Sequence, residues 1–207
     1  MIPSLVLKAA RATGRPRFFD MSGKPLLGGH PQGQAFVLSA PVTSERLVVT
    51  AAHLAVEANA IEVATADLQR VLVRGSGRRV APAEIALVND FVAFVAQGSG
   101  PSLSLAPREP EAAEAVFVLA APGTEDSEPI VLSGTVAEVS EEGTFLVSPD
   151  PALDPDEIES CVGAPIVDAA GKVVGLCVSA PERDGRRLLA SPRLEVLRTV
   201  LSSAPSA

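Results

Sequence analysis

Short apolar segments recur along the whole chain, and residues that favour turns separate them. The segments are rich in Val, Leu and Ile, and they are bounded by Gly, Pro, Asp and Ser. This pattern is typical of an all-β sandwich or barrel, in which short strands follow one another through turns. The predicted strands cover residues 34–39, 46–52, 60–65, 70–75, 84–88, 91–96, 116–121, 129–140, 143–148, 164–168, 172–179 and 186–191.

The turn signals divide these strands into two units of similar size. The segment "APREPEAAEA" holds two prolines and several charged residues, which favours a linker over residues 108–115. We therefore expect an N-terminal extension at 1–33, a first β unit at 34–107 and a second at 116–191. Within the second unit, "DAAGK" predicts a hairpin turn in which Gly171 takes a positive φ.

The period of the pattern changes near the C-terminus. In "SPRLEVLRTVLSS" the apolar residues fall on one helical face behind a Ser-Pro start, which predicts a helix over 192–203. That face consists of Leu194, Val196, Leu197, Val200 and Leu201.

Composition is that of an ordinary globular chain. Of the 207 residues 47% are hydrophobic, and no apolar run is long enough to cross a bilayer. The first residues lack the features of a secretory signal, so we expect a cytoplasmic protein. Cys161 and Cys177 are too few for a disulfide framework, which favours reduced, buried thiols over a bridge.

Charge is distributed unevenly along the chain. Residues 1–108 carry 11 basic and 7 acidic side chains, a balance of +4, whereas residues 109–207 carry 6 and 18, a balance of −12. Such an acidic half repels nucleic acid and anionic membranes, and it favours a basic peptide or protein partner. Acidic loops that only keep the protein soluble would give the same pattern. The sequence does not specify an oligomeric state.

Two motifs introduce candidate chemistry. His53 ends the strand-like "RLVVTAAH", and Asp90 precedes the alternating "FVAFVAQ". In this order they resemble the "TAAH" and aspartate motifs of the trypsin-like serine peptidases, a double-barrel family that includes the bacterial HtrA-type enzymes. The resemblance implies that His53 is the general base and Asp90 the carboxylate that orients it. It also implies two packed six-stranded antiparallel β-barrels followed by a short C-terminal helix.

The third match is incomplete. "APIVDAAGKVVGL" is similar to the segment that follows the family's Gly-x-Ser-Gly-Gly-Pro, but alignment on Pro165 places Val162 at the nucleophile. Ser160 then replaces the first glycine of an oxyanion loop that comprises Ser160, Val162 and Gly163. The family's oxyanion hole uses backbone N–H groups at the positions of Ser160 and Val162. Asp156 falls where some relatives place the charge that selects basic side chains.

Three interpretations of these motifs remain open. The chain is a pseudopeptidase that binds a peptide or protein without cutting it, or an endopeptidase with a displaced Ser160 or Cys161 nucleophile. In the third, the "TAAH" match is a coincidence in an unrelated β domain. No cofactor is implied, and two histidines without a Cys/His cluster predict no zinc site. His30 is interpreted as a loop residue.

Overall fold

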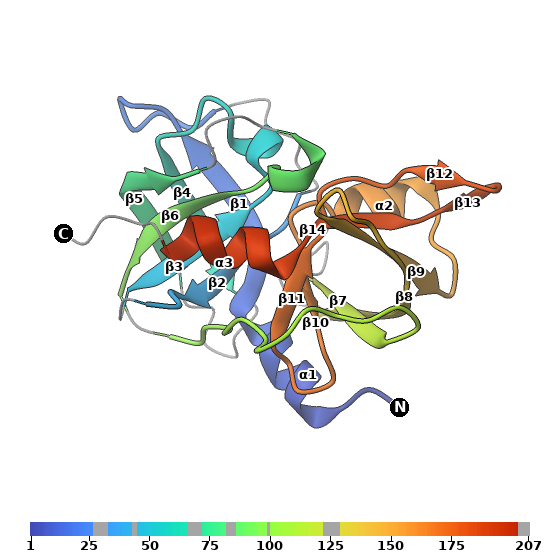
Figure 1. Ribbon diagram of the computed structural model, residues 1–207. Helices are drawn as coiled ribbons and strands as arrows, with labels where there is room; N and C mark the ends of the chain where they lie inside the picture. The colour runs from blue at the N-terminus through green and yellow to red at the C-terminus, as the bar shows by residue number, and fades with distance from the viewer. Residues whose placement is uncertain are drawn as a thin grey trace.

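The computed structural model describes residues 1–26, 33–42, 45–65, 72–81, 86–98, 100–121 and 129–202. It is built almost entirely of antiparallel strands in two barrels that lie side by side, with short helices at the ends and in some of the connections (Figure 1). The prediction of a double barrel with a C-terminal helix is confirmed.

The first barrel is a closed sheet of six strands in the order β1-β2-β3-β6-β5-β4. Each strand pairs antiparallel with its neighbours, so no edge is left open. Its strands are β1 (Thr13–Phe19), β2 (Ala35–Ser39), β3 (Arg46–Thr50), β4 (Ala60–Thr65), β5 (Leu72–Val80) and β6 (Val92–Gln97).

Two boundaries differ from the prediction. Helix α1 (Ser4–Ala9) and the 3-10 turn η1 (Ala10–Ala12) precede β1, so the first barrel begins inside the segment assigned to an N-terminal extension. In place of a strand at 84–88, the described part forms the 3-10 turn η3 (Leu87–Asn89). There the Asn89 side chain accepts the N–H of Ala86 at 2.7 Å, and Leu87 is exposed rather than turned into a core.

The second barrel is a six-stranded sheet in the order β11-β10-β7-β8-β9-β14. Its ends nearly meet, because Val178 N–H donates to the Ala190 carbonyl at 2.9 Å and Ala190 N–H to that of Ser179 at 2.8 Å. Its strands are β7 (Ala115–Ala120), β8 (Ile130–Val139), β9 (Thr144–Asp150), β10 (Pro165–Val167), β11 (Val173–Leu176) and β14 (Leu189–Pro192).

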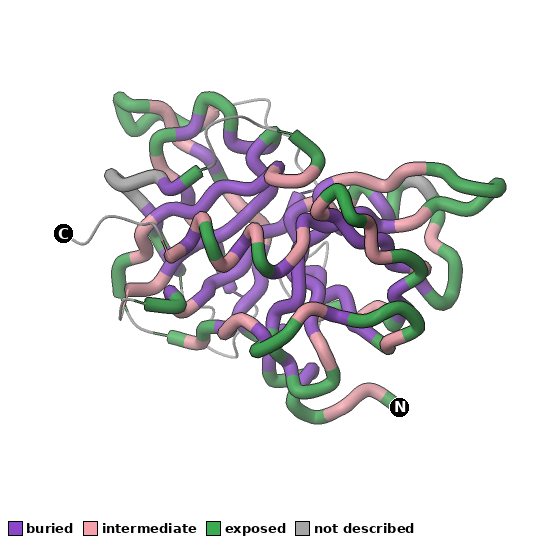
Figure 2. The backbone as a smooth tube through the Cα atoms, viewed as in Figure 1, coloured by how far each residue is buried: buried purple, intermediate pink, exposed green. Residues whose placement is uncertain are grey.

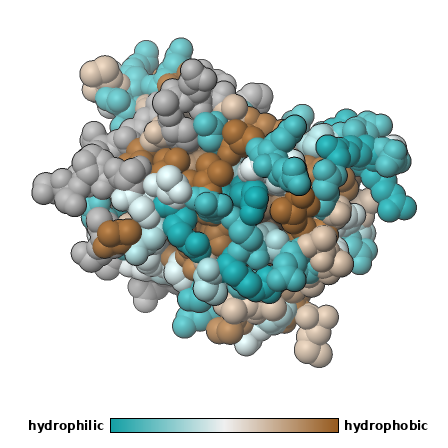
Figure 3. Space-filling view, viewed as in Figure 1, coloured by the Kyte–Doolittle hydropathy of each residue, from teal (hydrophilic) through white to brown (hydrophobic). Residues whose placement is uncertain are grey.

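Two hairpins extend this barrel. The predicted turn between β10 and β11 is present, with Gly171 at φ +72°. A small ribbon of β12 (Glu182–Arg183) and β13 (Arg186–Arg187) projects from the barrel, and Figure 3 shows its hydrophilic surface at the right of the view.

Strand β7 lies at the junction of two apolar cores. Its Val116 and Val118 pack into the core of the second barrel, whereas Phe117 and Leu119 pack into the core of the first. Since successive side chains in a strand point to opposite faces, one strand seals both cores. Figure 2 shows the buried chain continuing from one barrel to the other. The two barrels are therefore held as one packed unit, which fixes any site between them.

Helix α3 (Leu194–Ser202) crosses from one barrel to the other (Figure 1). Leu194 is buried in the second core, and Leu197 and Leu201 are buried in the first, as the predicted apolar face requires. The carboxylate of Glu109 accepts the N–H groups of Leu194 at 3.1 Å and Glu195 at 2.6 Å. Thus a linker residue satisfies the free donors at the start of the helix. Among the described residues, no helix combines the length and apolar character needed to span a membrane.

Replacing Glu109 with Ala should lower the free energy of unfolding by about 1–2 kcal/mol, because two helix N–H groups lose their acceptor. Urea unfolding followed by circular dichroism measures the change. Glu111→Ala is the matched control, since its side chain is 79% exposed, and it should change stability by less than about 0.5 kcal/mol. Equal effects of the two substitutions would contradict a capping role for Glu109.

Candidate active site

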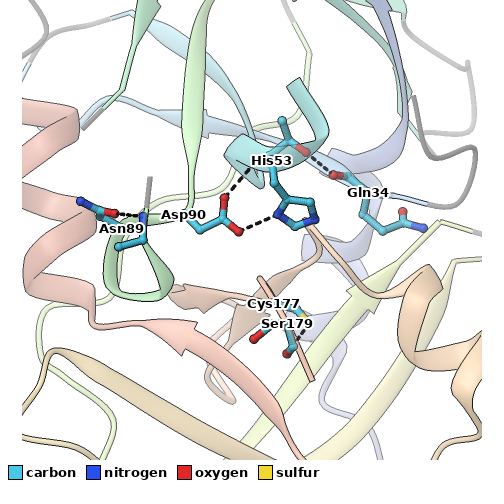
Figure 4. A network of polar contacts seen from close by, with 8 residues as sticks. Gln34, His53, Asn89, Asp90, Cys177 and Ser179 are labelled. Carbon is cyan, nitrogen blue, oxygen red and sulfur yellow. Dashed lines mark hydrogen bonds and ion pairs between the residues drawn. The ribbon is translucent and has the colours of Figure 1, made fainter. Parts of the chain in front are cut away.

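Two segments of the first barrel bring His53 and Asp90 together (Figure 4). His53 lies on the 3-10 turn η2 (Ala52–Ala55) directly after β3, and Asp90 lies between η3 and β6. His53 Nδ1 is 2.6 Å from Asp90 Oδ2, and the His53 backbone N–H donates to Asp90 Oδ1 at 3.0 Å. The carboxylate thus holds both the ring and the backbone that carries it.

The environment of this pair leaves one ring nitrogen available. The His53 side chain is 40% exposed, whereas that of Asp90 is 12% exposed. Ala51 and Ala52 are fully buried, so the turn packs tightly against the barrel. Within the described part of the chain, no hydrogen bond reaches His53 Nε2. A ring held in this way can accept a proton at Nε2 from a group placed beside it.

A short helix leads into the loop that should carry the nucleophile. Helix α2 (Pro155–Ser160) begins with a capping box, in which Asp154 Oδ1 accepts the N–H of Glu157 at 2.9 Å. Glu157 Oε2 in turn accepts the N–H of Asp154 at 3.0 Å. The sequence prediction missed this helix, although "DPDE" carries the signal of an acidic cap, a proline at the first helical position and a glutamate at the third. Asp156 lies exposed on α2.

Val162 follows the helix at the predicted nucleophile position. Its side chain is partly buried and packs against the first core. Its N–H donates to the Glu159 carbonyl at 3.3 Å, and its carbonyl accepts the N–H of Gln34 at 2.7 Å. Ser160, the other predicted oxyanion position, is the last residue of α2. Backbone N–H groups at that point are directed back along the helix axis, so the loop continues the helical turn.

The side chains of the two candidate replacement nucleophiles donate hydrogen bonds to the same backbone carbonyl of α2. Ser160 Oγ donates to the carbonyl of Glu157 at 2.6 Å, and the Cys161 thiol donates to it at 3.3 Å. Cys161 is fully buried in the second core. That burial raises the pKa of its thiol to about 11, and the nearby charge of Glu157 adds to the shift. The structure therefore joins His53 to Asp90 but not to Ser160 or Cys161.

Gln34 fastens this loop to the first barrel, and sequence reasoning did not identify it. The residue is fully buried, and its side-chain Nε2 donates to the Ser160 carbonyl at 3.0 Å. Its Oε1 accepts the N–H of Ala121 at 2.8 Å, and its backbone carbonyl accepts the Thr50 hydroxyl at 2.7 Å. A glutamine at the start of a predicted strand reads as a surface residue, so the sequence carries no clear signal for this role.

Gly163 allows the loop to approach Gln34. It has φ +83°, and a Cβ at this position would collide with the Gln34 carbonyl and lie 2.8 Å from the Thr50 hydroxyl. Its N–H donates to the carbonyl of Cys177 at 2.7 Å. Only glycine meets both requirements of this site. Cys177 is buried and free, like Cys161, as predicted.

Residues 33–176 match the family model described as a trypsin-like peptidase domain. The chain belongs to the trypsin-like peptidase family. No curated protein matches the chain by sequence.

Solved structures agree in fold with this trypsin-like domain. The Rv3671c protease from M. tuberculosis in its active form has a TM-score of 0.65 at 17% identity, with 100% of this chain and 89% of that chain covered. The serine endoprotease from Yersinia pestis has a TM-score of 0.64 at 14% identity, with coverage of 97% and 65%. The HtrA-type protease AlgW with a decapeptide gives 0.63 at 16%, with coverage of 97% and 66%. At identities this low, the structural similarity shows a shared fold and nothing more specific.

Within the trypsin-like fold, the described residues show no sign of a metal centre. No group of three or more His, Cys, Asp or Glu side chains in the described ranges is arranged to hold a metal ion. His30 lies outside the described residues.

The burial of Cys161 predicts slow alkylation. The thiolate is the reactive form, and a pKa of about 11 in place of 9.0 lowers its fraction at pH 8 by about 100-fold. In a Cys177→Ala variant, which leaves one thiol, we expect iodoacetamide to react at pH 8 at least about 100-fold more slowly with folded than with urea-unfolded protein.

The rate of alkylation of Cys161 should also depend on pH. Because burial raises the pKa, the rate in the folded protein should increase about tenfold per pH unit up to about pH 11. A fast reaction at pH 8 that levels off near neutrality would indicate an activated thiolate at Cys161 and would contradict this assignment.

Proposed function

We propose that this trypsin-like domain is a pseudopeptidase, which binds a peptide or protein segment near His53 and does not cleave it. The observation that carries the proposal is Val162 at the nucleophile position. An isopropyl side chain has no lone pair and no acidic proton, so His53 has nothing to activate there. In triad enzymes the members act as a unit, and loss of the nucleophile alone removes about 10⁶-fold of the rate.

The hydrogen bonds of the loop support the same proposal. Peptide hydrolysis needs N–H donors aimed at the developing oxyanion. Here the N–H of Val162 donates to Glu159, and Ser160 is part of α2. Gln34 holds the carbonyls of both loop residues, which stabilises this arrangement over one with outward N–H groups. In the described loop, the valine at 162 and the inward N–H groups therefore both support a site that does not hydrolyse peptides.

A second candidate function is peptide hydrolysis by a displaced Ser160 or Cys161. The observation in its favour is the pair of His53 and Asp90, which has the short contact expected of a working base. Hydrolysis by this route would require Ser160 or Cys161 to leave the Glu157 carbonyl, and the last turn of α2 to unwind. For Cys161 it would also require a buried thiol to reach the surface.

Activity-based labelling separates the two candidates. We expect neither a fluorophosphonate probe nor an iodoacetamide probe to label the folded protein in a His53-dependent manner, and His53→Ala is the matched control. Mass spectrometry should find no cleavage of a peptide library after long incubation. Labelling or cleavage that the His53→Ala substitution abolishes would overturn the proposed pseudopeptidase.

The substitution Val162→Ser provides a sharper form of this test. It restores the hydroxyl, but the N–H of residue 162 still donates to Glu159, so we expect no fluorophosphonate labelling. The additional change Ser160→Gly, which frees the loop from its helical turn, should be needed before any labelling is detected. Labelling of Val162→Ser alone would show that an oxyanion site is already formed and would contradict the geometry described above.

The charge of α2 indicates the class of partner. Asp156, Glu157 and Glu159 are exposed on the helix that leads into the loop. We propose that a basic segment is bound at this end of the site, because unpaired carboxylates attract Lys and Arg side chains and steer their approach.

Fluorescence anisotropy with two unstructured peptides of equal length, one Arg-rich and one Glu-rich, tests this proposal. We expect the basic peptide to bind at least about tenfold more tightly, and its affinity to fall as salt rises. The variant Asp156→Asn/Glu159→Gln should weaken that binding at least about threefold. Glu141→Gln/Glu142→Gln, which has the same net charge and alters the turn between β8 and β9 in place of α2, should not. An equal loss of affinity in both variants would show that only the net charge matters and would reject a binding site at α2.

A further inference from the structure

A cavity lies on the opposite side of the second barrel from α2, at the turn between β10 and β11. It is open to solvent, has a volume of about 380 Å³ and is lined by residues of α1 and η1, residues 101–104 and residues 170–172. In Figure 1, α1 lies beside the loop that joins β10 and β11. None of the residues of the candidate active site lines this cavity.

Three basic side chains line the cavity, and no acidic residue does. Lys8 is in the last turn of α1, Arg11 is in η1, and Lys172 follows the glycine of the hairpin turn. Lys172 Nζ donates to the Ser104 hydroxyl at 2.7 Å. The acidic residue of the same turn, Asp168, instead accepts the N–H groups of residues 170 and 172 through Oδ1, at 2.8 and 2.9 Å.

The three basic residues that line the cavity have no carboxylate partner among the described residues. Among the described residues, no carboxylate lies within 4.0 Å of the charged groups of Lys8, Arg11 or Lys172. By contrast, Arg74 pairs with Glu62 at 2.8 Å, and Arg108 and Arg183 also pair with glutamates. Placing three positively charged side chains close together is unfavourable unless an anion offsets their repulsion. In a protein of net charge −8, carboxylates for that purpose are plentiful, but none is placed here.

We propose that this cavity binds a small dianion, either a phosphate ester or a dicarboxylate. Lys and Arg supply charge-assisted hydrogen bonds to such groups, and Ser102 and Ser104 supply hydroxyl donors. An apolar floor that includes Ala9 and Leu103 can accept a short carbon skeleton. The volume lies within the range of small-molecule sites.

Binding in this cavity would fasten three segments of the chain to one another. Gly171 already lies directly under α1, since a Cβ on it would be 2.8 Å from the Leu5 carbonyl and 3.2 Å from the Ala9 side chain. An anion shared by Lys8, Arg11 and Lys172 would add an ionic contact across the same junction. Amide hydrogen exchange within α1 should therefore slow when the ligand binds.

Isothermal titration calorimetry with glycerol 3-phosphate and with succinate, each against chloride, tests the proposal and distinguishes the two ligand classes. We expect at least one dianion to bind the wild-type protein with a dissociation constant below about 1 mM. The variant Lys8→Gln/Arg11→Gln should weaken this binding at least about tenfold. Lys24→Gln/Arg187→Gln is the matched control, because it also lowers the net charge from −8 to −10, and its affinity should stay within about twofold of wild type.

Hydrogen exchange provides a second, independent readout. In the wild-type protein the ligand should slow exchange in residues 4–12, and in Lys8→Gln/Arg11→Gln it should not. The site is rejected if neither dianion binds, if both variants lose affinity equally, or if binding leaves exchange in α1 unchanged. None of these measurements depends on peptidase activity, so their outcome is separate from that of the proposed function.

Discussion

The buried side chain of Gln34 makes the contacts on which the arrangement of this site depends. Its amide donates to the Ser160 carbonyl and accepts from the N–H of Ala121, which joins α2 and the end of β7 to the first barrel. An amide in a dry site is costly to leave unpaired, so these bonds fix the loop in one position. The positive φ of Gly163 and the inward N–H of Val162 follow from that position. Loop geometry is thus set from the first barrel as well as by its own sequence.

Much of the fold could be predicted because strands buried on one or both faces leave a strong apolar pattern. Strand β7 is a continuous apolar run for a physical reason, since each of its faces packs into a different core. Strand β1 escaped prediction because Arg15, Pro16 and Arg17 interrupt its pattern, yet it pairs with β4 from Gly14 to Phe19. Conversely, a strand was predicted at 84–88 from its apolar residues, but Leu87 faces solvent and is not part of a core. The apolar pattern of a sequence reveals which segments are buried. Strands that lack such a pattern can be recognised only from their pairing with distant strands.

Some residues of the candidate site could likewise be predicted from the sequence, and others could not. His53 and Asp90 were found because each lies next to a buried strand in a short, recognisable motif. Ser160 and Cys161 could be named but not oriented, because their directions depend on α2, whose six residues are held by a capping box rather than by an apolar stripe. Gln34 could not be found at all, since its partners lie 126 and 87 residues away in the sequence. The residues that decide the chemistry are those whose contacts are most distant.

The presence of His53 and Asp90 does not itself require catalysis. One carboxylate oxygen of Asp90 accepts the His53 backbone N–H, and the Asp90 carbonyl accepts the N–H of Ala52 at 3.3 Å. Asp90 therefore satisfies donors at the start of η2, where the chain leaves β3, whether or not the imidazole ever accepts a proton. The imidazole, 40% exposed, is then held in a fixed orientation as a consequence of that turn. A pair of this kind can therefore persist as a structural contact, and its presence alone does not establish peptidase activity.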